Sequence, residues 1–159
     1  MKITILCVGR LKERFMREAV QEYTKRLSRY VKLDIVEVPD EKTPDNASDK
    51  EEQQIKDREG QKLMKHIKND DYVVALALDG IQYDSIAFSQ KIDRFGISGE
   101  GNVVFVIGGS LGLSEEILRR SDEKISFSKM TFPHQLMRVI LLEQIYRSYR
   151  IIKNEPYHK

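Results

Sequence analysis

The chain has a single cysteine and no long run of apolar residues. One thiol excludes an intrachain disulfide, and Cys7 with three scattered histidines does not form a structural zinc site. No segment has the length and apolar character of a membrane span, and charged residues from Arg10 onward end the apolar amino terminus too early for a signal peptide. We therefore expect a cytoplasmic protein without a membrane partner.

A strong excess of charge of either sign is also absent. The net charge is +2 with 33% charged residues, which by itself does not indicate a nucleic-acid binder. Positive charge is concentrated in residues 138–159 and negative charge in residues 40–52, and both are typical of solvated faces. A length of 159 residues with 40% hydrophobic residues predicts one globular domain, 1–159.

Apolar runs alternate with segments of helical periodicity along the whole chain. The alternation predicts an α/β fold with a mostly parallel sheet and helices on both faces. The densely apolar runs 73–78 and 103–107 are typical of central strands. Strands are expected at 2–8, 33–38, 72–78, 102–107 and 123–127, and helices at 16–30, 48–68, from 85 to 96 or 99, at 114–120 and at 134–153.

The last expected helix carries apolar residues on more than one side. Such a helix must bury both sides. We expect one side to pack on the sheet and the other to meet a second subunit, which predicts a symmetric homodimer through the C-terminal helix.

A glycine-rich turn follows the strand expected at 102–107. Its position, at the carboxyl end of a central strand, is where open α/β sheets bind ligands. Asp79-Gly80 is an ordinary turn signal that should end the neighbouring strand and form the other wall of the same crevice. Neither a dinucleotide fingerprint nor a Walker A sequence is present.

The same turn, 108–112, fits the nucleophile pattern G-x-S-x-G. Ser110 would be the nucleophile of a serine hydrolase, with Asp122 and either His134 or His158 completing the triad. The low strand count and the short chain count against this alternative. A non-catalytic RNA-binding module, with the basic residues of the first helix on phosphates, is a second alternative.

In the second half of the chain, a series of short motifs resembles the RlmH family of SPOUT-class methyltransferases. The motifs are Leu76-Ala77-Leu78-Asp79-Gly80, Phe105-Val106-Ile107-Gly108-Gly109, Leu113-Ser114, Thr131-Phe132-Pro133-His134, Arg138, Glu143, Tyr146-Arg147 and Pro156-Tyr157-His158. The first half matches mainly through its opening strand. The resemblance implies methyl transfer from S-adenosylmethionine to N3 of a pseudouridine in 23S ribosomal RNA of the large subunit or assembled ribosome. It also implies a C-terminal trefoil knot and a homodimer.

The resemblance further implies roles for individual residues. Cofactor-binding residues would be Leu76, Gly108, Phe127, Ser128, Lys129, Met130, Thr131 and Phe132. No metal is required, because a sulfonium is already an activated methyl donor. For the reaction itself we expect Tyr157 and His158 to close over the site, and Arg138 to bind a phosphate or stabilise the charge that develops on the base.

Overall fold

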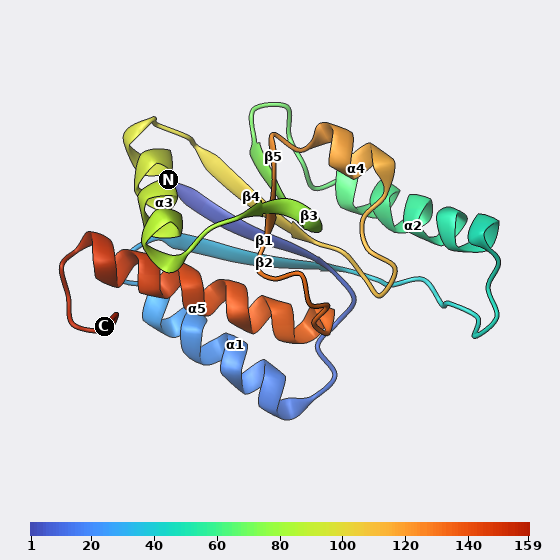
Figure 1. Cartoon of the computed structure of the whole chain (residues 1–159), viewed down its shortest axis with the longest axis horizontal. Coiled ribbons are helices and arrows are strands. Elements are labelled where there is room, and N and C mark those ends of the chain that lie inside the picture. The colour runs from blue at the N-terminus through green and yellow to red at the C-terminus, as the bar shows by residue number, and fades with distance from the viewer.

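The computed structural model describes all residues, 1–159, and its centre is one five-stranded parallel sheet (Figure 1). The strand order is β2-β1-β4-β3-β5, and every pairing in the sheet is parallel. The strands are β1 (Lys2–Val8), β2 (Lys32–Val38), β3 (Tyr72–Gln82), β4 (Asn102–Ile107) and β5 (Glu123–Ser126). Both β1 and β4 are almost entirely buried, as expected for strands that are covered on both faces.

Helices cover both faces of this sheet. One core forms where α1, α3 and α5 pack on one face, and a smaller core forms under α2 and α4 on the other. The helices are α1 (Arg14–Leu27), α2 (Asp49–Met64), α3 (Ser85–Ile97), α4 (Glu115–Arg120) and α5 (His134–Ile152). The expected fold class, an α/β sheet with helices on both faces, is confirmed.

Side-chain caps fix the starts of three helices. Ser48 and Glu51 form the capping box expected at the start of α2. Asp84 accepts a hydrogen bond from the Ala87 amide at α3, and Ser114 accepts one from the Ile117 amide at α4. These caps explain why the helix starts were readable from the sequence.

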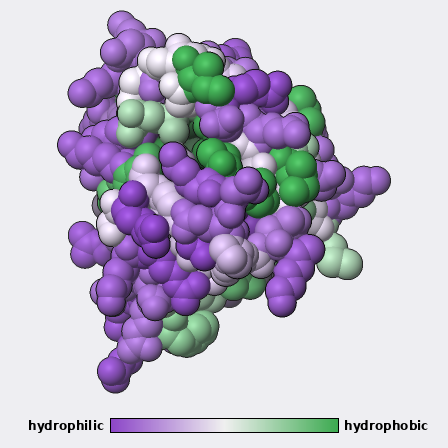
Figure 2. Space-filling view, turned by 90° about the vertical axis from the view of Figure 1, so that its left-hand side faces the viewer, coloured by the Kyte–Doolittle hydropathy of each residue, from purple (hydrophilic) through white to green (hydrophobic).

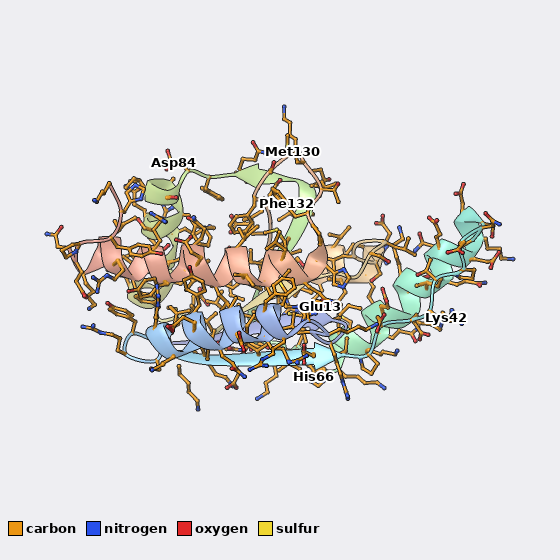
Figure 3. The ribbon with its side chains drawn as sticks, turned by 90° about the horizontal axis from the view of Figure 1, so that it is seen from below. Glu13, Lys42, His66, Asp84, Met130 and Phe132 are labelled. Carbon is orange, nitrogen blue, oxygen red and sulfur yellow. The ribbon has the colours of Figure 1, made fainter.

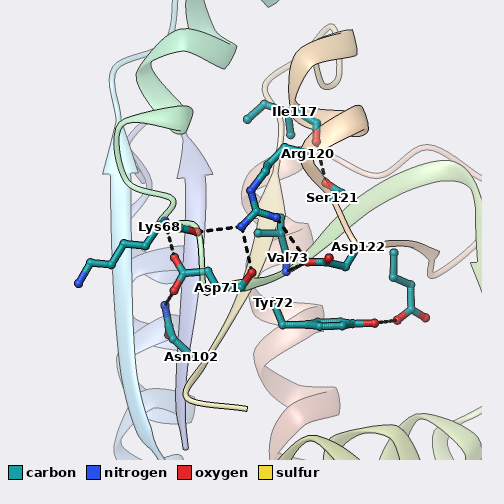
Figure 4. Close-up of polar contacts among 10 residues, drawn as sticks. Lys68, Asp71, Tyr72, Val73, Asn102, Ile117, Arg120, Ser121 and Asp122 are labelled. Atoms are coloured by element: carbon teal, nitrogen blue, oxygen red, sulfur yellow. Dashed lines mark hydrogen bonds and ion pairs between the residues drawn. The ribbon is translucent and has the colours of Figure 1, made fainter.

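A polar network ties the sheet together at its amino end (Figure 4). The side-chain amide of Asn102 donates to the Asp71 carboxylate at 2.9 Å, and the same carboxylate accepts from the main-chain N–H of Lys68 at 2.8 Å. Arg120 donates to the main-chain oxygens of Lys68 and Asp71. The network therefore joins α4 to the ends of β3 and β4, far from the carboxyl edge where ligands are expected.

One expectation about an individual element is wrong. Strand β3 does not end before Asp79-Gly80 but continues to Gln82, and a register shift between Leu76 and Ile81 lets it pair with β5 on both sides of this dipeptide. A Cβ on Gly80 would lie 2.5 Å from the carbonyl carbon of Ile125, so only glycine allows the two strands to approach this closely.

Most of the apolar surface of α5 is covered within its own chain, and the expected homodimer through this helix stays a prediction. Its two apolar sides are buried largely within the same chain, because α5 lies between α1 and α3 and against the sheet. A second subunit is therefore not needed to explain most of its apolar surface. What remains half-buried on the outside is a stripe at helical spacing: Leu136, Val139, Ile140, Glu143 and Arg147. We call this stripe the outer face of α5.

The remaining surface is mostly polar. The end of the molecule at which the C-terminus lies is largely hydrophilic, with separate small groups of hydrophobic side chains (Figure 2). None of the five helices is long and apolar enough to cross a membrane.

Candidate cofactor-binding site

A cavity of about 760 Å³ opens at the carboxyl end of the sheet. Its walls come from three main parts of the chain: Leu76–Leu78 of β3, the turn from Ile107 to Leu113, and residues 125–128 and 130–134, which lead from β5 into α5. Leu118 of α4 and Met137 of α5 complete the lining. The volume falls in the range of small-molecule sites. The predicted crevice between the carboxyl ends of β3 and β4 is therefore present.

Glycine makes the turn after β4 possible. A Cβ on Gly108 would lie 2.8 Å from the carbonyl carbon of Gly112, so the main chain at the start of the turn is in contact with the main chain at its end. Gly112 has φ +89°, and its amide donates to the carbonyl of Gly109 at 3.1 Å, which closes the turn. At Gly108 and Gly109 this wall has no side chain, so a ligand can approach the main chain closely there.

The opposite wall is the segment that joins β5 to α5. Ser128 organises it: its hydroxyl accepts from the Met130 amide at 3.0 Å, and its carbonyl accepts from the Ser126 hydroxyl at 3.0 Å. Phe127 packs edge-on against Phe88 of α3 with ring centres 5.9 Å apart. Figure 3 labels Met130 and Phe132 in this segment, and the Met130 side chain is 73% exposed.

No aspartate, glutamate, lysine or arginine lines the cavity. The one titratable side chain in its wall is His134 in the first turn of α5. Burial, followed by the positive charge of Arg138, lowers the pKa of His134 below its usual value, and Asp40 opposes this shift. A neutral cavity with main-chain donors and acceptors suits a nucleoside and tolerates a sulfonium cation, but it lacks the cations that a triphosphate needs.

Seven of the eight expected cofactor-binding residues lie in this wall: Leu76, Gly108, Phe127, Ser128, Met130, Thr131 and Phe132. Lys129 is exposed and does not line the cavity. Its position between two lining residues restricts any role to its main chain.

Arg138, the residue expected to bind a phosphate, is buried inside the protein. Its side chain is 1% exposed and donates to Glu37 at 2.6 Å and to the carbonyls of Val8 and Gly9 at 3.0 and 2.6 Å. The guanidinium is buried, both of its terminal nitrogens are engaged, and only Nε has no hydrogen-bond partner, so it offers no exposed group to a ligand in this chain. In this chain Arg138 holds the end of β1 and Glu37 instead, and its expected role on a phosphate or on the reacting base stays a prediction.

Tyr157 and His158 lie far from Arg138 in the same chain. The Tyr157 hydroxyl donates to Glu143 at 3.0 Å, and His158 Nδ1 lies 3.1 Å from Arg147. Burial and the bond to Glu143 raise the pKa of Tyr157 to about 12. Arg147 lies nine positions beyond Arg138, which is about two and a half helical turns, so the two side chains leave opposite sides of α5. The tail thus lies against the outer face, away from its own cavity.

The alternative hydrolase site is not assembled. Asp122 accepts from the Val73 amide at 2.8 Å, at the amino end of β3, whereas Ser110 lies beyond the carboxyl end of β4. The two ends of a parallel sheet cannot supply neighbouring members of one triad. His158 is likewise held on the outer face by Arg147.

Sequence reasoning missed Glu59, a carboxylate behind the cavity wall. Glu59 is 4% exposed, accepts from the Glu41 amide at 3.0 Å, and lies 3.2 Å from where a Cβ of Gly109 would be. Burial raises its pKa. The available signal was Gly60 in the middle of a helix: a Cβ there would meet the Ser114 hydroxyl at 2.2 Å, which shows how closely α2 approaches the start of α4.

The parallel α/β fold with a cavity at the carboxyl end of its sheet is the architecture of an enzyme that binds a small cofactor. A profile of the family described as predicted SPOUT methyltransferase matches residues 1–158. The chain therefore belongs to the SPOUT methyltransferase family. Membership implies S-adenosylmethionine as the methyl donor and a C-terminal trefoil knot.

Relatives of the same length narrow the family further. Proteins from Clostridium tetani and Clostridium novyi are 63% and 60% identical over 159 residues, covering 100% of both chains, and one from Clostridium kluyveri is 58% identical over the same length. All three are named ribosomal RNA large subunit methyltransferase H. The resemblance to the RlmH family is thereby confirmed.

One solved structure supports the fold alone. A probable methylase family protein from Haemophilus influenzae aligns with a TM-score of 0.55 and 11% identity, covering 99% of this chain and 70% of that one. No group of three or more His, Cys, Asp or Glu side chains in the chain is arranged to hold a metal ion.

Proposed function

We propose that the protein transfers the methyl group of S-adenosylmethionine to N3 of a pseudouridine in 23S ribosomal RNA of the large subunit. The observation that carries this proposal is the uncharged cavity at the carboxyl ends of β3 and β4, found in a SPOUT methyltransferase. Relatives that are 58–63% identical are named for large-subunit ribosomal RNA. A ribosomal substrate would place the protein in the cytoplasm.

The residues of the cavity fit this cofactor. Main-chain groups of the Gly108 turn and of residues 127–132 can read the edge of an adenine, and apolar side chains such as Leu76 can cover its ring. When bound, S-adenosylmethionine supplies the methyl group on a positively charged sulfur. Burial and the charge of Arg138 lower the pKa of His134, which disfavours a protonated ring in the cavity wall.

The reaction then requires alignment and removal of one proton. N3 of the base loses its proton as it attacks the methyl carbon, so a group near the target must accept or relay that proton. We propose that the tail residues Tyr157 and His158 lie next to the target base and supply this group. In one chain the tail lies on the side of α5 opposite Arg138, so we infer that the tail serves the cavity of a second copy.

A symmetric dimer through the outer face of α5 would permit this arrangement. If two copies of α5 run antiparallel across a twofold axis, the carboxyl end of each helix lies beside the amino end of the other. The cavity borders the amino end of α5 at His134, and the tail follows its carboxyl end. The half-buried Leu136, Val139 and Ile140 support a contact on this face.

Two measurements test the proposal. Calorimetric titration of the full chain with S-adenosylmethionine should show binding, and a chain truncated after Glu155 should bind equally well but no longer methylate ribosomes that lack the modification. Ser110→Ala is the matched control and should keep its methylation activity. A wild-type chain that binds no S-adenosylmethionine rules out the proposed function, and full activity of the truncated chain rules out the role of the tail.

A further inference from the structure

The loop between β1 and α1 lies beside the cavity and has no assigned role. It follows Gly9, whose Cβ, if present, would lie 3.6 Å from Nε2 of His134 in the cavity wall. In Figure 1 this loop and the start of α5 lie at the same end of the molecule. A polymer whose reacting base enters the cavity would therefore pass close to residues 10–15.

Unusually many main-chain groups of this loop are fixed. The Gly9 amide donates to the Val38 carbonyl at 2.7 Å, and the Gly9 carbonyl accepts from Arg138. The Leu11 amide donates to Glu37 at 3.1 Å, and Arg17 donates to the Lys12 carbonyl at 2.6 Å. Because Arg138 also holds Glu37, one buried guanidinium positions both sides of the loop.

This rigid loop presents cations that have no partner. Arg10 and Lys12 are exposed, and neither side chain takes part in an ion pair within 4.0 Å. The next cation, Arg14, differs because Glu18 neutralises it at 2.8 Å. Phe15, one residue later, is 65% exposed, so its ring contributes little to the core. Residues 10–15 thus combine unpaired cations with an exposed aromatic ring in one short segment, and such side chains bind the phosphates and bases of unstacked RNA.

We propose that Arg10, Lys12 and Phe15 bind the RNA strand that flanks the target base, with the two cations on phosphates and the phenyl ring stacked on a base. This inference rests on the proposed function and adds a substrate-binding surface to it. Arg138 and Glu37 act as positioning residues that hold the loop in place for this contact.

The double variant Arg10→Ala/Lys12→Ala tests the cations. Its binding to ribosomes lacking the modification, and to an RNA stem-loop from the large subunit, is measured over a range of salt concentrations. Each lost phosphate contact should reduce the slope of log affinity against log salt by roughly 0.7–0.9, so the slope should fall by roughly 1.5. The KM for RNA should rise roughly tenfold at low salt, with kcat little changed. Lys50→Ala/Lys65→Ala is the charge-matched control, since both lysines are exposed and unpaired on α2 and its cap.

Phe15 has a different signature. Phe15→Leu should weaken RNA binding without changing the salt slope. Phe15→Tyr should bind RNA as tightly as the wild type, because a tyrosine ring stacks on a base and a leucine side chain does not. Ile97→Ala, at another exposed apolar side chain, should change neither quantity.

Titration with S-adenosylmethionine separates this inference from the proposed function. If the wild type binds the cofactor and methylates RNA while the double variant keeps the wild-type salt slope and KM, the loop surface is not an RNA site. Loss of affinity for ribosomes with unchanged affinity for the RNA fragment would point instead to a ribosomal protein and would also overturn the inference.

Discussion

At the scale of single residues, Arg138 shows that the type of a residue does not reveal where its side chain lies. The resemblance to a methyltransferase family led us to expect a catalytic role for this arginine. The structure instead buries it against two main-chain carbonyls and Glu37. These partners come from β1 and β2, more than 100 residues earlier in the chain, so no local pattern could have revealed them.

Its burial leads to a prediction about stability. Arg138→Met should reduce the free energy of unfolding by on the order of 3 kcal/mol, because Glu37 and two carbonyls lose a charged donor together. Arg14→Met is the matched control: its ion pair with Glu18 is exposed to solvent, where such pairs contribute at most about 1 kcal/mol. Urea denaturation followed by circular dichroism measures both. Equal losses in the two variants would show that the buried contacts of Arg138 contribute no more than a surface pair.

At the scale of elements, most of the fold could be predicted because its signals are local. Caps such as Ser48 and Ser114, and the apolar runs of β1 and β4, are read from neighbouring residues. The continuation of β3 through Asp79-Gly80 could not be predicted, since a typical turn dipeptide is overridden by pairing with β5, more than 40 residues later. The cavity could be located from the sequence because open α/β sheets bind ligands at the carboxyl ends of their strands, and a glycine-rich turn follows β4 there. The sites of the tail and of Arg138 depend on tertiary packing.

The Gly108 turn offers a direct test at this scale. Gly108→Ala should abolish binding of S-adenosylmethionine, because the new methyl group would lie 2.8 Å from the main chain of Gly112 and must displace the cavity wall. Gly96→Ala is the matched control, since nothing lies within 4 Å of its Cβ position near the end of α3. That substitution should leave binding unchanged and raise stability by up to about 1 kcal/mol. Calorimetric titration and thermal unfolding distinguish these effects, and cofactor binding by Gly108→Ala at wild-type affinity would contradict the role assigned to the turn.

At the scale of the whole molecule, the cavity and the tail lie apart in one chain, so the site as proposed needs a second copy. The cavity borders the amino end of α5, whereas Tyr157 and His158 are held near Glu143 and Arg147 on the outer face. The same outer face carries the half-buried Leu136, Val139 and Ile140. One contact between two copies would therefore cover these side chains and bring each tail toward the other cavity.

Two defective chains can test whether the tail acts across such a dimer. A chain truncated after Glu155 keeps an intact cavity, and Gly108→Ala keeps an intact tail but loses the cavity wall. Each alone should be inactive in methylation. When the two are unfolded together and refolded as a mixture, heterodimers should regain part of the activity, because one cavity in each then receives a complete tail from its partner. Adding Ile140→Asp to both chains should leave monomers in sedimentation and remove the regained activity, since a buried carboxylate without a partner disfavours the contact. If the mixture stays inactive while sedimentation shows heterodimers, the tail must reach the cavity of its own chain, and α5 would have to release it first.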